Sequence, residues 1–281
     1  MEPLVLMLIA LLCMSAGAIG ALMGIGGGLI IIPLLTLGFN IPMQEAIGAS
    51  LIGVIATSTG AATKYVKQGL TNVRLALFLE MSTTLGSIVG ALIAVYTNQT
   101  LLFLLFSALL VYAGYTMLRR SEVTFTPEQA EAEGQMVDLS CRYVDPRNSC
   151  EVSYGVKGLN KGLAYSSVAG MLSGLLGVGG GLVKVPVMSV CMCVPLKAAA
   201  ATSNFMIGVT ALTGAIIFYG HGLLNAYLCG AVALGTFAGA YIGTILMARY
   251  SSSDLRKWFS LLLFVVAVTM VMKAFGLWGG A

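Results

Sequence analysis

The sequence predicts an all-α integral membrane protein made of two inverted four-segment repeats, each beginning with a glycine-broken re-entrant or V-shaped helix. The first observation behind this is composition. Hydrophobic residues make up 58% of the 281-residue chain and charged residues only 9%, whereas soluble domains carry about 25% charged residues. The second is a series of apolar segments of membrane-spanning length. The third is an internal repeat that relates the two halves of the chain.

The apolar segments follow one another along almost the whole chain. They lie at roughly 4–38, 46–63, 75–96, 100–118, 160–193, 198–219, 226–248 and 255–277. Most contain the roughly 20 residues that cross a bilayer core of about 30 Å. A signal peptide would leave the later segments unexplained, and its usual basic flank is missing, because Glu2 precedes the first segment.

A polar stretch in the middle of the chain separates the apolar segments into two groups. It is rich in Glu, Asp and Arg and contains Pro127 and Pro146. We therefore expect a first transmembrane repeat at 1–119, a cytoplasmic loop at 120–158 and a second transmembrane repeat at 159–281.

The two groups of segments align without gaps at a single offset of 153 residues (177 minus 24). At this offset "GIGGGLIIIP" (24–33) lies over "GVGGGLVKVP" (177–186). The same offset pairs Pro42 with Pro195, Ser50 with Ser203, and Gly86 and Gly90 with Gly239 and Gly243. Each half is therefore expected to fold as one unit of four segments.

The first segment of each half is too long for one straight helix across the bilayer, and glycines interrupt it. Each glycine costs a helix about 1 kcal/mol relative to alanine, and Pro33 and Pro186 disturb the helix again. We expect helix, break, helix in both halves. The glycines are Gly24, Gly26, Gly27, Gly28, Gly177, Gly179, Gly180 and Gly181.

Lys and Arg residues favour broken segments that turn back within the membrane over segments that cross it. Cytoplasmic loops carry an excess of these residues, and the basic connections are 64–74 and 249–257. Full crossings would place these two connections on opposite faces. Returning segments place them on the cytoplasmic face together with the middle loop. This predicts a multi-pass protein of the cell (inner) membrane with both termini extracytoplasmic.

Beyond these patterns, the motifs themselves look familiar. The motif GxGGGLxxxP, present twice, followed by "VPLKAAAATSNFMIGVTALTGA" (194–215), resembles the TauE/SafE-type sulfite exporter family, also called the toluene sulfonate uptake permease family. The resemblance covers nearly the whole chain apart from the middle loop. It implies movement of small anions, often sulfur-containing ones such as sulfite or organosulfonates, across the cytoplasmic membrane. The family is broad, so the resemblance names neither the anion nor the direction of transport.

The glycine breaks are candidate substrate-binding sites. A half-helix that begins near Gly27 or Gly180 presents free backbone N–H groups and the positive end of its dipole, which together attract anions. In transporters, broken helices of this kind meet near the midplane between repeats. The alternative is tight helix packing through small residues. A phosphate loop is excluded because no G-K-[ST] follows the glycines.

Two charged residues inside apolar segments are further candidates. Lys184 would complete the positive charge of an anion site, or would extend to the membrane surface as Lys273 can near the end of its segment. The residue that matches Lys184 in the other half is Ile31, so the site would be asymmetric. Glu80 is a candidate for coupling transport to protons; it could equally pair with Lys184 or lie near the cytoplasmic end.

Polar residues at the start of the second segment of each half complete the candidate substrate-binding set. Their hydroxyl and amide groups are expected where those helices begin, as anion donors or as helix caps. They are Ser50, Thr202, Ser203 and Asn204.

Histidine and cysteine residues predict neither a catalytic centre nor a metal site. His221 is the only histidine and lies in a short connection, where a surface role is expected. Cys141 and Cys150 lie in the expected cytoplasmic loop and should be reduced. Cys191 and Cys193 are read as small buried residues rather than as a relay for sulfur. No cofactor is implied.

The sequence thus favours a secondary transporter of small anions, with the bilayer as its surroundings and the proton as the candidate coupling ion. The alternative is an anion channel-like pore. An intramembrane enzyme would need a catalytic pair that the apolar segments lack, and a cation transporter would show several buried carboxylates rather than Glu80 alone. The net charge of +4 is too small to suggest nucleic-acid binding.

Overall fold

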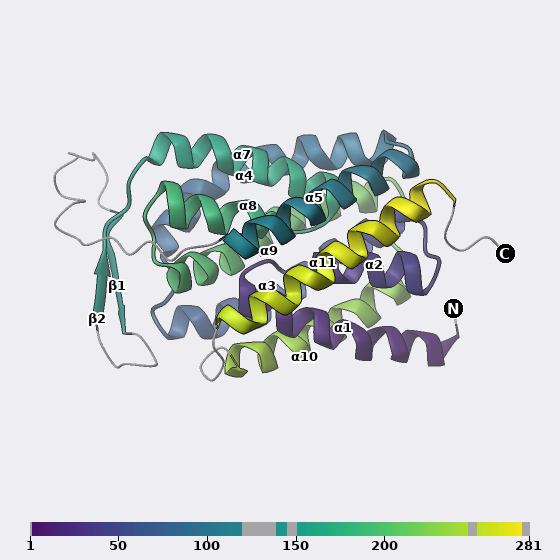
Figure 1. Ribbon diagram of the computed structural model, residues 1–281, viewed down its shortest axis with the longest axis horizontal. Coiled ribbons are helices and arrows are strands. Elements are labelled where there is room, and N and C mark those ends of the chain that lie inside the picture. Colours follow the sequence, from purple (N-terminus) through teal and green to yellow (C-terminus); the bar gives the residue numbers. More distant parts are fainter. Residues whose placement is uncertain (1, 120–138, 145–150, 247–251, 277–281) are drawn as a thin grey trace.

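A computed structural model describes residues 2–119, 139–144, 151–246 and 252–276 as a bundle of long helices that run roughly side by side (Figure 1). Six of the described helices are long and apolar enough to cross a membrane. The protein is therefore a multi-pass membrane protein, as its composition predicts. The six helices are Pro3–Met23, Met43–Lys67, Val73–Tyr96, Gln99–Thr116, Leu196–Gly220 and Ala226–Ile245.

The first half of the chain contains four long helices and one short arm. The arm consists of α2 and a π-helical turn, η1, and it follows α1 directly. The bounds are α1 Pro3–Met23, α2 Gly28–Pro33, η1 Leu34–Gly38, α3 Met43–Lys67, α4 Val73–Tyr96 and α5 Gln99–Arg119.

The second half repeats this order. Its bounds are α7 Leu159–Leu176, α8 Gly181–Pro186, η2 Val187–Cys191, α9 Leu196–Gly220, α10 Ala226–Leu246 and α11 Ser252–Ala274. The expected helix, break, helix pattern is present at both glycine motifs. The prolines do not end the arms; Pro33 and Pro186 stand where each arm passes from α-helix to π-helix.

The middle loop holds a feature that the sequence analysis missed. Strands β1 (Cys141–Val144) and β2 (Glu151–Tyr154) form a small antiparallel hairpin. Tyr143 and Tyr154 are buried there against apolar residues from the ends of neighbouring helices. Four-residue strands inside a polar stretch give too short an alternating pattern to be recognised.

Glycines let the chain reverse direction at each break. Gly24, Gly26 and Gly27 have φ angles of 72°, 81° and 79°, in the left-handed region that other residues avoid. A Cβ on Gly27 would lie 2.9 Å from the carbonyl oxygen of Ala16, which lies two turns back in α1. The chain after the break therefore returns alongside the helix before it, and Gly180 has the same relation to Ala169 in α7.

The two halves interlock as one body. α1 packs against α10 and α7 against α4, while α3 packs on α9 and α5 on α11. Glycines allow the closest approaches: a Cβ on Gly90 would lie 2.0 Å from the Met171 oxygen, and one on Gly239 would lie 1.9 Å from the Met14 oxygen. The repeat relates these contacts: α1 against α10 corresponds to α7 against α4, and the pairs α3–α9 and α5–α11 each join corresponding helices of the two halves.

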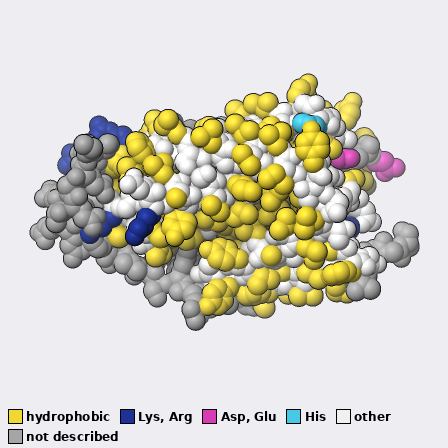
Figure 2. All heavy atoms as spheres, turned by 90° about the horizontal axis from the view of Figure 1, so that it is seen from above, with side chains coloured by type: hydrophobic (Ala, Val, Ile, Leu, Met, Phe, Trp, Pro, Cys, Tyr) yellow, Lys and Arg dark blue, Asp and Glu magenta, His cyan; other side chains and the backbone are white. Residues whose placement is uncertain are grey.

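The two ends of the bundle differ in charge. The start of α1 and the end of α11 lie at one end, and the β1–β2 hairpin lies at the other (Figure 1). On the face in Figure 2, hydrophobic side chains cover the middle of the molecule, and Lys and Arg gather mainly at the hairpin end. Leu77, Met81 and Leu85 on α4 are among the exposed apolar residues that suit contact with lipid.

Candidate functional site

The tips of the two broken segments meet inside the bundle. A Cβ on Gly28 would lie 2.5 Å from the Gly177 carbonyl oxygen, and one on Gly181 would lie 2.1 Å from the Gly24 oxygen. Any side chain at Gly28 or Gly181 would therefore push the tips apart. The approach is reciprocal, because the same offset of 153 residues (177 minus 24, 181 minus 28) relates the two contacts.

Two serines, related by the same offset, each form a hydrogen bond with the tip of the opposite repeat. Ser50 Oγ donates a hydrogen bond of 2.8 Å to the Gly177 oxygen, and Ser203 Oγ donates one of 2.9 Å to the Gly24 oxygen. Both serines are fully buried. Each serine thus satisfies a carbonyl at the end of the helix before a break, where no helical donor follows.

The tips also carry backbone donors. Among the described residues, no atom accepts a hydrogen bond from the amides of residues 27–29 or 180–182, and all six residues are buried. Buried amides without an acceptor are rare in proteins. Two groups of amides at the starts of short helices, close to each other, form a positive region that lacks an acceptor.

Apolar side chains fill the space over the tips. A Cβ on Gly179 would lie 2.6 Å from Ile207 and 2.9 Å from Val54, and Gly26 has the same two neighbours. Val54 and Ile207 are themselves related by the offset (207 minus 54 is 153). The structure is therefore closed at the tips, and an anion can reach the amides only if these side chains or the tips move.

One turn beyond the second tip, Lys184 belongs to a buried polar group. Its Nζ donates a hydrogen bond of 2.7 Å to Thr210 Oγ1 on α9 and lies 3.7 Å from Glu80 Oε2 on α4. Thr210 Oγ1 lies 2.6 Å from Glu80 Oε1, to which it can donate. Lys184 is 1% exposed, so the expectation that it extends to the membrane surface is wrong, and its pairing with Glu80 is confirmed.

The predicted position of the hydroxyl and amide donors is wrong. The helices begin earlier, at Met43 and Leu196, with Pro42 and Pro195 as the preceding caps. Proline marks such starts because its fixed φ and missing N–H suit the first turn. Ser50 and the residues at 202–204 therefore lie inside helices and cap nothing.

Thr202 and Asn204, the other two predicted donors, form hydrogen bonds with other parts of the protein. Thr202 Oγ1 accepts a 3.0 Å hydrogen bond from the Asn72 amide, and Asn204 Nδ2 donates a 2.9 Å bond to the Ala21 oxygen near the first tip. Asn204 Oδ1 and Ser173 Oγ are buried without a hydrogen-bond partner among the described residues. Ser173 borders Gly180, since a Cβ on that glycine would lie 3.3 Å from the Ser173 Cβ.

Sequence reasoning missed Thr210, Ile207 and Val54. A usable signal existed, because Ser203, Ile207 and Thr210 are spaced four and three residues apart and so share one face of a helix. That face of α9 meets both the tips and Lys184.

Histidine and cysteine residues lie apart from this region. His221 is exposed just after the end of α9, and its Nδ1 lies 2.8 Å from the Ile217 oxygen of that helix. Cys191 is exposed and Cys141 and Cys193 are half-buried, so the expectation that Cys191 is a buried residue is wrong. Cys150 lies outside the described residues. The described part of the chain contains no group of three His, Cys, Asp or Glu residues that could hold a metal.

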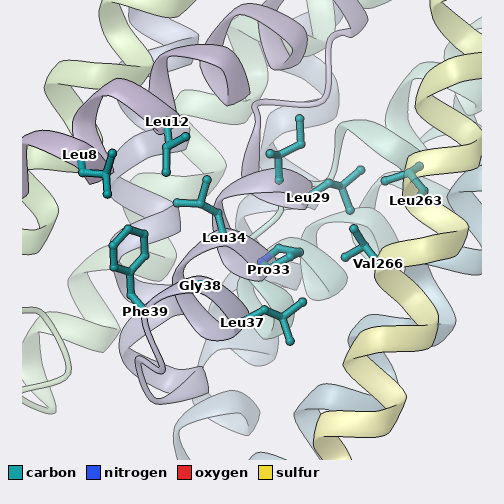
Figure 3. Close-up of a pocket in the computed structure, with 11 residues that line it drawn as sticks. Leu8, Leu12, Leu29, Pro33, Leu34, Leu37, Gly38, Phe39, Leu263 and Val266 are labelled. Carbon is teal, nitrogen blue, oxygen red and sulfur yellow. The ribbon is translucent and has the colours of Figure 1, made fainter. Parts of the chain in front are cut away.

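A cavity of about 500 Å³ lies beside the first tip, between α1, the α2–η1 arm and α11 (Figure 3). The side chains that line it are all apolar. They include Leu8 and Leu12 from α1, Leu29, Pro33, Leu34 and Leu37 from the arm, and Leu263 and Val266 from α11. The cavity offers no side-chain donor to an anion, so it is not the candidate substrate site.

Comparison with known proteins finds relatives over nearly the whole chain. The family model for "Sulfite exporter TauE/SafE" matches residues 9–270. The probable membrane transporter protein YunE of Bacillus subtilis is 24% identical over 274 residues, which cover 95% of this chain and 97% of the relative. YdhB of the same organism, also described as a probable membrane transporter protein, is 27% identical and covers 84% and 88%. The probable membrane transporter protein MJ0441 of Methanocaldococcus jannaschii is 24% identical, covering 96% of both chains. No solved structure gives a significant match.

Proposed function

The chain belongs to the TauE/SafE sulfite exporter family of membrane transporters, and from this premise we propose that it is a secondary transporter of small anions. Sulfur-containing anions of the sulfite or organosulfonate type are the first candidates, because the family description names sulfite. The names of the relatives state only membrane transport. The substrate binds at the broken-helix tips, between the two repeats.

The observation that carries this proposal is the pair of amide groups at 27–29 and 180–182, buried and without acceptors among the described residues. Each helix start carries roughly half a positive elementary charge. An oxyanion between the tips would accept hydrogen bonds from both groups. Lys184, whose backbone amide donates to the Gly180 oxygen at 3.1 Å, is within one turn of them.

The closed tips support a transporter over a channel-like pore. A pore needs a continuous path, whereas Val54 and Ile207 pack over both tips. The reciprocal contacts between the repeats support alternating access, in which each half takes the conformation of the other in turn. In such a cycle the site opens to one side of the membrane at a time.

We further propose that the broken segments are re-entrant and that the two repeats are inverted. The reversal of the chain at each break supports this, because each half then crosses the membrane an odd number of times. Both termini lie outside the cell, and the loop with the hairpin lies in the cytoplasm. The Lys and Arg residues at the hairpin end support that orientation (Figure 2).

Anion binding to the purified protein tests the proposal. Sulfite, thiosulfate, methanesulfonate and acetate are added in turn, and the unfolding temperature is measured. A ligand that binds only the folded protein raises that temperature. We expect at least one sulfur oxyanion to raise it and to show saturable flux in proteoliposomes. Flux that rises linearly with concentration, without saturation, would favour the channel-like alternative.

A further inference from the structure

Lys184 and Thr210 of the second repeat and Glu80 of the first form a charged group that has no counterpart at the first arm. At the offset of 153, Lys184 corresponds to Ile31 (184 minus 153) and Glu80 to Ala233 (80 plus 153). The first arm is built with Ile31 buried at the equivalent place. The fold of a repeat therefore does not require the charged pair, which indicates a functional role.

The pair is also poorly arranged for stability. A strong charge-assisted hydrogen bond measures about 2.7–2.9 Å, whereas Lys184 Nζ lies 3.7 Å from Glu80 Oε2. Within the described residues, Oε2 is buried and accepts no hydrogen bond. Because burying two charges costs about as much as their attraction returns, the pair adds little net stability, and neutralising Glu80 would leave Lys184 with a buried charge that needs a new partner.

Resting on the anion transport proposed above, we propose that Glu80 takes the place of the anion at Lys184 when the site is empty, and that proton binding to Glu80 releases Lys184 to the substrate. A proton from water binds the free lone pair of Oε2, and the carboxylate becomes neutral. Lys184 keeps its charge and turns to the anion at the tip one turn away. After the anion leaves, the proton returns to water on the other side, so each anion moves together with one proton.

The geometry gives each residue a distinct part. The Lys184 side chain has no exposed surface, while 10% of the Glu80 side chain is accessible, so Glu80 is the less enclosed member of the pair. Thr210 contacts both charged groups and can donate to the carboxylate or to the Met206 oxygen, at 2.6 and 3.1 Å. It can therefore turn its hydroxyl away when Glu80 becomes neutral.

The other ionisable groups around α4 lie on the elements packed against it. They are Glu45, Lys64, Tyr65 and Lys67 on α3, Lys161 and Tyr165 on α7, and Lys197 and Tyr219 on α9, with Arg74 and Tyr96 on α4 itself and Tyr143 and Tyr154 on the hairpin. Lys161, Tyr165 and Arg74 are exposed. Lys184 is the charged group that forms the ion pair with Glu80.

Binding and transport of methanesulfonate test the inference, because the charge of this anion does not change between mildly acidic and mildly alkaline pH. Its affinity is measured by calorimetry at both pH values for the wild type, Glu80→Gln and the control Glu45→Gln, which is the same change in the first turn of α3. Uptake into proteoliposomes is measured with and without a pH gradient. Sulfite, titrated at a single pH, serves as the second anion.

We expect the wild type and Glu45→Gln to bind the anion more weakly at alkaline pH. Glu80→Gln should bind it about ten- to a hundredfold more tightly there, with no pH dependence, because the carboxylate no longer competes. The pH gradient should drive accumulation by the wild type, while Glu80→Gln should exchange anions without accumulating them. Calorimetry of the wild type in two buffers of different ionisation enthalpy should give about one proton taken up per anion bound, a result that needs no variant to fold.

Each contrary result overturns a definite claim. Unchanged affinity in Glu80→Gln at both pH values, with accumulation still driven by the gradient, refutes the inference and leaves anion transport standing. Anion binding by the wild type without proton uptake does the same. Absence of binding and flux for both anions refutes the proposed function and the inference together.

Discussion

A single added methyl group at the tip contact should separate the two repeats. In Gly181→Ala the new Cβ would lie 2.1 Å from the Gly24 carbonyl oxygen and 2.8 Å from Ile207 Cδ1. Real Cβ atoms do not approach closer than 3.0 Å, so the backbone must shift by at least 0.9 Å (3.0 minus 2.1). Overpacking of this kind costs about 1–3 kcal/mol. The same shift would move the amides at 180–182 away from an anion between the tips.

A matched control is Gly230→Ala on α10, where an added Cβ meets nothing within 4 Å. There the change should be neutral or should stabilise the helix by up to about 1 kcal/mol. Denaturation of both variants in detergent, together with calorimetry of anion binding, measures the difference. The reasoning is refuted if Gly181→Ala matches the wild type in both stability and anion affinity, because the tip contact would then accommodate a Cβ without a shift of the backbone.

Other consequences can be tested on the same protein. Lys184→Met should weaken anion binding by about ten- to a hundredfold, measured by calorimetry, and Lys184→Arg should do less harm; equal affinity in the Met variant would remove the lysine from the site. Ser203→Ala and Ser50→Ala should each lower the free energy of unfolding by about 1–3 kcal/mol, since each leaves a tip carbonyl unsatisfied; chemical denaturation should give similar losses for the two. Single cysteines at the exposed positions Asn98 and Gln68, in a background without the native cysteines, should react with an impermeant thiol reagent outside the cell only at Asn98; the reverse pattern would turn the topology over.

Much of the fold could be predicted because the internal repeat and the hydrophobicity pattern both indicate two halves with the same order of segments. Three glycines in each motif have left-handed φ angles, which cannot continue a helix, so the breaks follow from residue chemistry alone. The spacing of apolar segments fixed the order of the long helices. The hairpin escaped prediction because its stability comes from tyrosines buried against helix ends far away in the sequence.

The candidate site was only partly predictable. Lys184 and Glu80 were conspicuous as charges in apolar segments, but their contact spans 104 residues of sequence (184 minus 80) and is set by how α4, α8 and α9 pack. Thr210 looked like one more small residue in an apolar helix. Ser50 and Ser203 were placed at helix starts because the apolar segments were read as beginning near 46 and 198. The helices begin at Met43 and Leu196, and the prolines before them were the better signal.

The most direct measurement of the central claim is a structure of the protein with selenite, a heavier analogue of sulfite whose selenium is located by anomalous scattering. If the substrate binds between the repeats, the selenium should lie close to the amides at 27–29 and 180–182, with Gly28 further from Gly177 and Gly181 further from Gly24 than they are here. Selenite bound at a distance from both tips, with Gly28 still against Gly177 and Gly181 against Gly24, would contradict the account.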